Sequence, residues 1–147
     1  MPLKLSAPLY ETFRLERSDE KYGDGGEPTT VRIKQAAQHE HEQRQQLFSI
    51  LRREYENKNP DTVTLVQVLS LEELKRLEVK LTLVECNIQD ENGKELFKFT
   101  KSDRPRIDMT DTQFANAWGT LPPDVANEIH EKVLEVNVQW SGMGEEN

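Results

Sequence analysis

The sequence has little cysteine, a low hydrophobic content and no long apolar segment. Its one cysteine, Cys86, cannot form an internal disulfide. No apolar run approaches the roughly 20 residues that cross a bilayer, and no signal-peptide core follows Met1. Hydrophobic residues make up only 35% of the 147 residues, which predicts a modest core and a heavily solvated surface. We therefore expect a cytoplasmic protein with one domain.

Basic residues are the scarcer charged type. Nineteen lysines and arginines stand against 27 aspartates and glutamates, and the formal net charge is -8. This excess of negative charge disfavours non-specific attraction to nucleic acid or to anionic lipid. We therefore expect no nucleic-acid partner and no membrane partner, whereas a basic or apolar polypeptide fits the composition better.

Alternating polar and apolar residues predict two strands near the beginning of the chain. Residues 1–9 carry little pattern, and we interpret them as an irregular arm. Residues 10–16 and 29–33 alternate with a period of two, and the polar stretch 18–28 between them contains three glycines. The pattern predicts a hairpin with a long loop.

A long helix is predicted over residues 35–57, which contain no glycine or proline. Leu47, Phe48 and Leu51 lie on one side of it at helical spacing. Its first half, residues 36–46, is polar, so we expect this part to project into water or to contact a partner. Residues 57–61 end the helix, because a residue before proline avoids the helical conformation.

A second helix is predicted after an apolar run at 63–68, which fits either a strand or a linker. Ser70 opens this helix with Glu73 completing a capping box, and an apolar stripe continues to about Asn87. The alternation after Leu77 also fits a strand that enters the next hairpin, and the helix is the favoured interpretation.

Two turns or loops are predicted beyond this helix. The dipeptide Asn92-Gly93 lies between apolar flanks and predicts a hairpin over residues 88–99. Residues 100–107 are polar and are interpreted as a loop.

The stretch 109–140 predicts two short helices set against each other. Thr110 and Gln113 match a capping box for the first helix, and Gly119 ends it. Pro123 suits the first turn of the second helix, where no hydrogen bond is lost. The apolar stripe of the second helix repeats at spacings of four, four and three residues: Val125, Ile129, Val133 and Val136.

Two motifs resemble metal sites but fail a test of spacing. His39 and His41 would point about 200° apart on a helix, whereas a helical zinc pair requires a spacing of four. Residues 88–99 resemble a calcium loop, but Ile88 and Phe99 occupy the first and twelfth positions, where oxygen ligands are needed. We therefore expect no metal site.

No catalytic pair is evident. Cys86 has no histidine within local sequence reach, and His130 lies among charged residues on the polar side of the predicted last helix. A basic stretch at 94–106 is diluted by acidic residues and is interpreted as a solvated loop. We therefore expect a binding protein without catalytic residues and without a cofactor.

The apolar side chains of the stretch 109–140 have two interpretations. The simpler one places them in the core, where a small domain needs its aromatic residues. The functional one leaves part of the stripe exposed to bind another polypeptide. The candidate partner-binding residues are Phe114, Trp118, Leu121, Val125, Ile129, Val133 and Trp140.

These elements predict a single, mainly helical α+β domain over residues 10–140. We expect three or four helices with one or two small β-hairpins. Residues 141–147 are interpreted as a flexible acidic tail.

The end of this domain resembles a known family. The run F-x-x-A-W-x-x-L-P-P-x-V-A-x-E-I-H-x-x-V-L-x-V-N, from Phe114 to Asn137, is similar to the C-terminal portion of tail assembly chaperones of long-tailed bacteriophages and prophages. The resemblance covers about residues 29–140 and rests on structural motifs. In one departure, Val138 follows Asn137 where the family is expected to have proline, which leaves the end of the last helix undefined.

The resemblance implies a protein of the host bacterial cytoplasm that is absent from the mature virion. It would bind the tape measure protein, keep it soluble and recruit tail tube subunits, and weak self-association is compatible with this role.

Three alternatives make different predictions. A structural virion component, such as a head–tail or tail-completion protein, would be found in purified particles. An acidic regulatory or inhibitor protein would cluster carboxylates on one face, and its binding would weaken as salt rises. An enzyme would place an aligned acid–base pair in a concave pocket.

Overall fold

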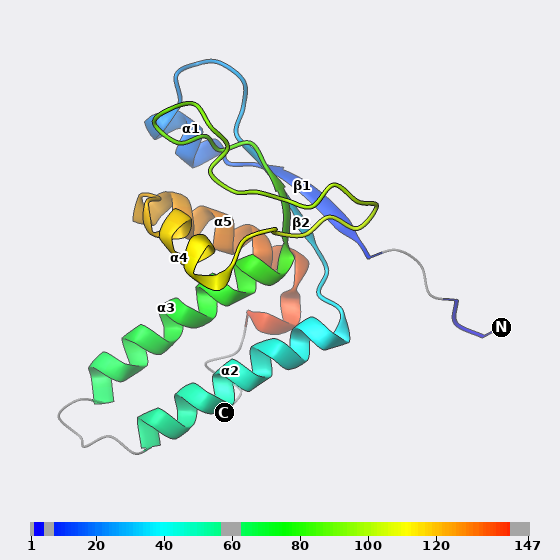
Figure 1. Cartoon of the computed structure of the whole chain (residues 1–147), viewed down its shortest axis with the longest axis vertical. Coiled ribbons are helices and arrows are strands. Elements are labelled where there is room, and N and C mark those ends of the chain that lie inside the picture. Colours follow the sequence, from blue (N-terminus) through cyan, green and yellow to red (C-terminus); the bar gives the residue numbers. More distant parts are fainter. Residues whose placement is uncertain (1, 5–7, 57–62, 142–147) are drawn as a thin grey trace.

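The fold is that of a small, mainly helical α+β protein, as predicted. The computed structural model describes residues 2–4, 8–56 and 63–141, with side chains described outside 51–56 and 63–70. Within these residues, five helices and one three-stranded antiparallel sheet are present (Figure 1). The predicted tail beyond Ser141 lies outside the described residues, and the described parts of the N-terminal arm contain no helix or strand.

The sheet has the order β1-β2-β3. Strands β1 (Tyr10–Arg14) and β2 (Thr30–Lys34) form the predicted hairpin, in a register that pairs Tyr10 with Lys34 and Arg14 with Thr30. Strand β3 (Leu83–Cys86) pairs with the other side of β2. The prediction that the helix continues to about Asn87 is therefore wrong for residues 83–86. These residues form a strand because they pair with the free edge of β2.

A helix interrupts the segment that was interpreted as a polar loop. Residues Glu16–Tyr22 form α1, whose first turn has no side-chain cap of its own. The loop prediction is correct for residues 23–28 and wrong for 18–22. A contact with a distant residue, described below, stabilises this helix.

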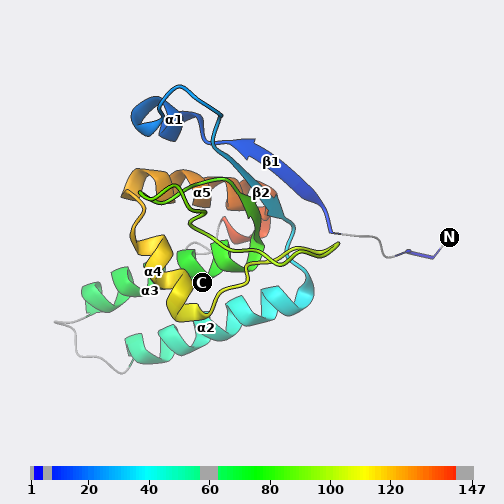
Figure 2. The ribbon, with the colours of Figure 1, turned by 45° about the horizontal axis from the view of Figure 1, so that its top comes forward.

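Two long antiparallel helices form an arm that extends away from the sheet (Figures 1 and 2). Helix α2 (Gln38–Glu56) begins three residues later than predicted, and α3 (Val63–Thr82) is continuous. Residues 63–68 are therefore helical, and Ser70 lies inside the helix instead of capping it. The predicted helix end at residues 57–61 lies outside the described residues.

Both predicted C-terminal helices are present, but each packs mainly against α3 and not against the other. Helix α4 (Asp111–Gly119) begins with the expected capping box, in which the Thr110 hydroxyl and the Gln113 side chain each accept a backbone N–H. Helix α5 (Pro123–Val136) has proline in its first turn. Its axis passes beneath the sheet, with α3 on its other side, so α5 is central to the core (Figure 2). The four residues of its predicted stripe are all buried.

The residue that ends α5 also joins it to the sheet. Asn137 is fully buried, and the short 3-10 helix Val138–Trp140 follows it. The side-chain oxygen of Asn137 accepts the Ala36 N–H at 2.8 Å, and its amide nitrogen donates to the Lys34 carbonyl at 3.2 Å. The helix thus ends without the proline expected from the resemblance.

The predicted hairpin at 88–99 is present as a tight turn with one isolated bridge. Gln89 pairs with Glu95, and Gly93 has a φ of +80°, a conformation that glycine adopts without strain. The Asp90 carboxylate accepts the backbone N–H groups of Asn92 and Lys94, so it stabilises this turn.

Candidate binding cleft

A broad cleft of about 1020 Å³ lies at the end of the molecule where β1 stops. Its walls come from three parts of the chain that are distant in sequence: α1 with the loop 23–29, the turn at 87–91, and the α4–α5 connection. Because the cleft is wide and open to solvent, its shape suits a segment of polypeptide better than an enclosed small molecule.

Acidic side chains dominate the rim of the cleft. Six carboxylates line it, against a single basic residue, Arg14. Clefts lined by charges of one sign concentrate the electric field, so this cleft attracts positively charged groups. The six carboxylates belong to Asp19, Glu20, Asp24, Glu27, Asp90 and Glu91.

The floor of the cleft is apolar. Ile88 and Leu96 contribute from the turn region, and Leu121, Pro122 and Val125 contribute from the α4–α5 connection and the first turns of α5. Ile88, Leu96 and Leu121 are half-buried and pack against the core. A ligand with apolar groups on one side and positive charges beside them matches this arrangement.

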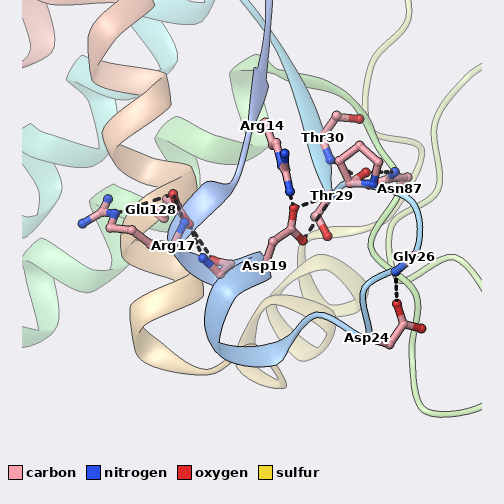
Figure 3. A network of polar contacts seen from close by, with 11 residues as sticks. Arg14, Arg17, Asp19, Asp24, Gly26, Thr29, Thr30, Asn87 and Glu128 are labelled. Carbon is pink, nitrogen blue, oxygen red and sulfur yellow. Dashed lines mark hydrogen bonds and ion pairs between the residues drawn. The ribbon is translucent and has the colours of Figure 1, made fainter.

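A buried glutamate of α5 fixes α1, which forms one wall. Glu128 accepts the Ser18 N–H at 2.9 Å, the Ser18 hydroxyl at 2.6 Å and the Arg17 N–H at 3.2 Å (Figure 3). These two N–H groups belong to the first turn of α1 and have no partner within the helix. Glu128 therefore caps α1 from a distance of 110 residues along the chain.

This arrangement also keeps Glu128 ionised. Burial alone would raise its pKa, but the hydrogen bonds from Ser18 and Arg17 favour the charged form, and the net effect lowers the pKa of Glu128. A negative charge at the beginning of a helix is further stabilised by the helix dipole.

Two polar contacts hold the loop 23–29 at its ends (Figure 3). Asp19 accepts the Thr29 N–H at 3.0 Å and the Arg14 guanidinium at 3.2 Å. Hydrogen bonding from Thr29 is the main reason that the pKa of Asp19 is lowered. Asn87 accepts the Thr30 N–H at 2.9 Å and donates to the Pro28 carbonyl at 2.9 Å, which ties the loop to the end of β3.

The predicted partner-binding residues are mostly buried. Leu121 and Val125 line the cleft, whereas the other five lie away from it. Those five residues are each 8% exposed or less, so the stripe is part of the core and offers no surface in this conformation. The simpler interpretation, that these residues form the core, is confirmed. The five residues are Phe114, Trp118, Ile129, Val133 and Trp140.

A buried polar cluster joins α2, α3 and α5, and sequence patterns did not reveal it. The Arg44 guanidinium donates to Glu78 at 2.6 Å, and both side chains are only 4% exposed. His130 shares a hydrogen bond with the other Glu78 oxygen at 2.6 Å. Trp140 Nε1 donates to His41 Nδ1 at 3.1 Å. One face of the polar half of α2, with Glu40 and Arg44, is thus buried against its own chain, and the other residues of that half are mostly exposed.

The contacts of this cluster join helices to one another, so its role is to stabilise the fold. Glu78 and His130 line a hollow of about 190 Å³ together with Ser141. The Ser141 hydroxyl, however, donates to the Val138 carbonyl at 2.7 Å, which is a bond within its own turn. Among the described side chains, no nucleophile is hydrogen-bonded to His130.

The one thiol is unreactive in the folded protein. Cys86 is buried, and burial raises its pKa to about 12, so the thiolate is scarcely populated at neutral pH. Within the described residues, no three His, Cys, Asp or Glu side chains converge as metal ligands.

Comparisons with known proteins identify no relative. No family model, no curated protein and no solved structure matches the chain. None of the helices in the described ranges combines the length and apolar character needed to cross a membrane.

Proposed function

We propose that this protein is a tail assembly chaperone of a long-tailed bacteriophage or prophage. In this role it binds the tape measure protein in the bacterial cytoplasm, keeps it soluble and recruits tail tube subunits. The resemblance of residues 114–137 to that family motivates the proposal. The observation that carries it is the cleft with an apolar floor and an acidic rim.

The shape and charge of the cleft suit one face of an amphipathic helix. A tape measure protein is expected to be a long helix with exposed apolar stripes, and such a helix aggregates when it is unassembled. A groove that covers a few turns of an amphipathic helix shields its apolar face, while the carboxylates of the rim contact basic residues beside that face. Weak contacts repeated along the helix allow later displacement by tube subunits.

The direct test is co-expression with the long helix-rich protein encoded nearby. We expect the soluble fraction of that protein to rise and the two proteins to co-purify. Three exposed glutamates of the rim make no hydrogen bond or ion pair with another described residue: Glu20, Glu27 and Glu91. The triple variant E20Q/E27Q/E91Q should lose most of the co-purification and keep the fold.

The matched control removes the same charge elsewhere. Glu73, Asp103 and Asp108 are exposed and do not line the cleft. The variant E73Q/D103N/D108N should co-purify as well as wild type. Equal loss in both variants would assign the effect to net charge, and unchanged binding in the rim variant would refute the cleft as the binding site.

The clustered carboxylates also favour a second candidate, an acidic inhibitor that occupies the nucleic-acid site of a basic protein. Such an inhibitor would compete with DNA or RNA for its target, and its affinity would fall steeply as salt rises. Failure of the co-expression test together with such competition would favour this candidate.

A further inference from the structure

One edge of the sheet is open. Strand β1 pairs only with β2, and Figure 2 shows no other part of the described chain along its outer side. Hydrogen bonds at both ends of the strand define which residues face β2. The Leu15 N–H donates to the Thr29 carbonyl at 2.9 Å, and the Gln35 N–H donates to the Leu9 carbonyl at 2.8 Å.

The alternation of an antiparallel pair then places every second backbone group outward. The backbone N–H and C=O groups of residues 9, 11, 13 and 15 point toward β2. Those of Tyr10, Thr12 and Arg14 therefore point away from β2, toward the open edge. These backbone groups make no hydrogen bond with the described part of the chain. An exposed row of this kind is a template for another strand.

We propose that this edge pairs with β1 of a second copy around a twofold axis at Thr12, which creates a six-stranded sheet across a homodimer. The three outward-facing residues are symmetric about Thr12. An antiparallel copy in this register pairs Thr12 with itself and Tyr10 with Arg14, and forms about six interstrand hydrogen bonds. If the register shifts by two residues, only two of these three hydrogen-bonded residue pairs remain, so the register centred on Thr12 is favoured.

The side chains match this register. Thr12 is exposed and meets its own symmetry mate, a favourable cross-strand pair. Glu11 is exposed and lies opposite Phe13 of the second copy, at a position where the two backbones approach closely. The Lys132 ammonium lies 5.5 Å from the centre of the Phe13 ring. Glu11 of each copy therefore meets Lys132 of the other copy, and the twofold axis repeats this contact.

Analytical ultracentrifugation over a range of concentrations tests the proposal. Wild-type protein should shift from monomer to dimer as its concentration rises. In Thr12→Pro the outward N–H is lost, and proline is tolerated at an edge position that does not bond to the neighbouring strand. We expect this variant to keep the far-ultraviolet circular dichroism of wild type and to remain monomeric.

A charge exchange tests the register. Glu11→Lys should weaken the dimer about tenfold, because residue 11 of each copy then repels Lys132 of the other copy. The twofold symmetry repeats this repulsion, so it occurs twice in the interface. Lys132→Glu should weaken it similarly, and the double variant E11K/K132E should recover most of the wild-type affinity. Glu42→Lys makes the same charge change on an exposed position of α2 and should have no effect.

Three results would overturn the proposal. Wild-type protein that stays monomeric at every concentration would exclude the dimer, whatever else the edge binds. A folded Thr12→Pro variant that dimerises like wild type would exclude this edge. A double variant no better than the single variants would exclude the register, and this comparison remains decisive if Thr12→Pro does not fold.

Discussion

Glu128 provides the strongest test of how the cleft is built. It is 3% exposed and accepts three hydrogen bonds from the first turn of α1. Glu128→Gln preserves the shape of the side chain but replaces one acceptor oxygen with an amide group that cannot accept. The Arg17 N–H then faces another donor and stays unsatisfied. An unsatisfied buried donor costs about 1–3 kcal/mol, and losing the charge at the helix terminus costs about 0.3–1 kcal/mol more.

Removing a buried charge also removes its desolvation penalty, which offsets part of this loss. We therefore expect Glu128→Gln to lower the free energy of unfolding by about 2 kcal/mol, and Glu128→Ala to lower it by about 3–4 kcal/mol, because Ala leaves every donor unpaired. Urea denaturation followed by circular dichroism measures both values. Hydrogen exchange should show faster exchange of the Arg17 and Ser18 amides in the variants.

The neighbouring Glu131 is the control. It contacts Arg17 at the surface and is 52% exposed, so Glu131→Gln should leave the free energy of unfolding close to that of wild type. A Glu128→Gln variant within about 0.5 kcal/mol of wild type, with unchanged exchange at Arg17 and Ser18, would refute the conclusion that Glu128 caps α1.

Three further predictions concern Asn137, the stability of the protein in acid, and Cys86. Asn137→Ala should lower the free energy of unfolding by about 2–4 kcal/mol in urea denaturation, because it leaves the Ala36 N–H unpaired. The pKa values of Glu128 and Asp19 in the folded protein lie below their ordinary values of 4.5 and 3.8. Both carboxylates therefore stabilise the folded protein when the pH is above those ordinary values. This stabilisation is lost as the pH falls through the lowered folded-state pKa values. In an acid titration, the free energy of unfolding of Glu128→Gln should therefore decline less than that of wild type below about pH 4.5. Cys86 should react with a thiol reagent only at the rate of unfolding, and fast reaction of the native protein would contradict its burial.

Local patterns predicted the parts of the fold that are determined by neighbouring residues. The Thr110 capping box and the stripe from Val125 to Val136 depend on spacings of three and four, and both are present. The turn at Gly93 depends on one residue that tolerates a positive φ. These features needed no knowledge of the tertiary structure.

Features that depend on distant residues were not predicted. Helix α1 lacks a local cap, and its cap Glu128 lies 110 residues away. The pattern of residues Leu83–Cys86 fits both a helix, which was favoured, and a strand, and pairing with β2 makes them a strand. Glu78 had no visible role, because its partners Arg44 and His130 belong to two other helices.

The acidic rim of the cleft was missed for the same reason. Its carboxylates come from α1, the loop 23–29 and the turn at 87–91, segments that in the sequence resemble ordinary solvated loops. They become neighbours because Asn87 at the end of β3 binds Thr30 and Pro28 beside β2. The pairing of β3 with β2, which no local pattern specifies, therefore brings these segments together.

The central claim is that the cleft binds a basic, amphipathic segment of another polypeptide. Hydrogen exchange on the complex with the candidate tape measure protein tests it most directly. The claim predicts that residues 20–29, 87–96 and 120–125 gain protection on binding, and that this protection falls as salt rises. A complex in which these segments exchange as in the free protein, with new protection only elsewhere, would contradict it.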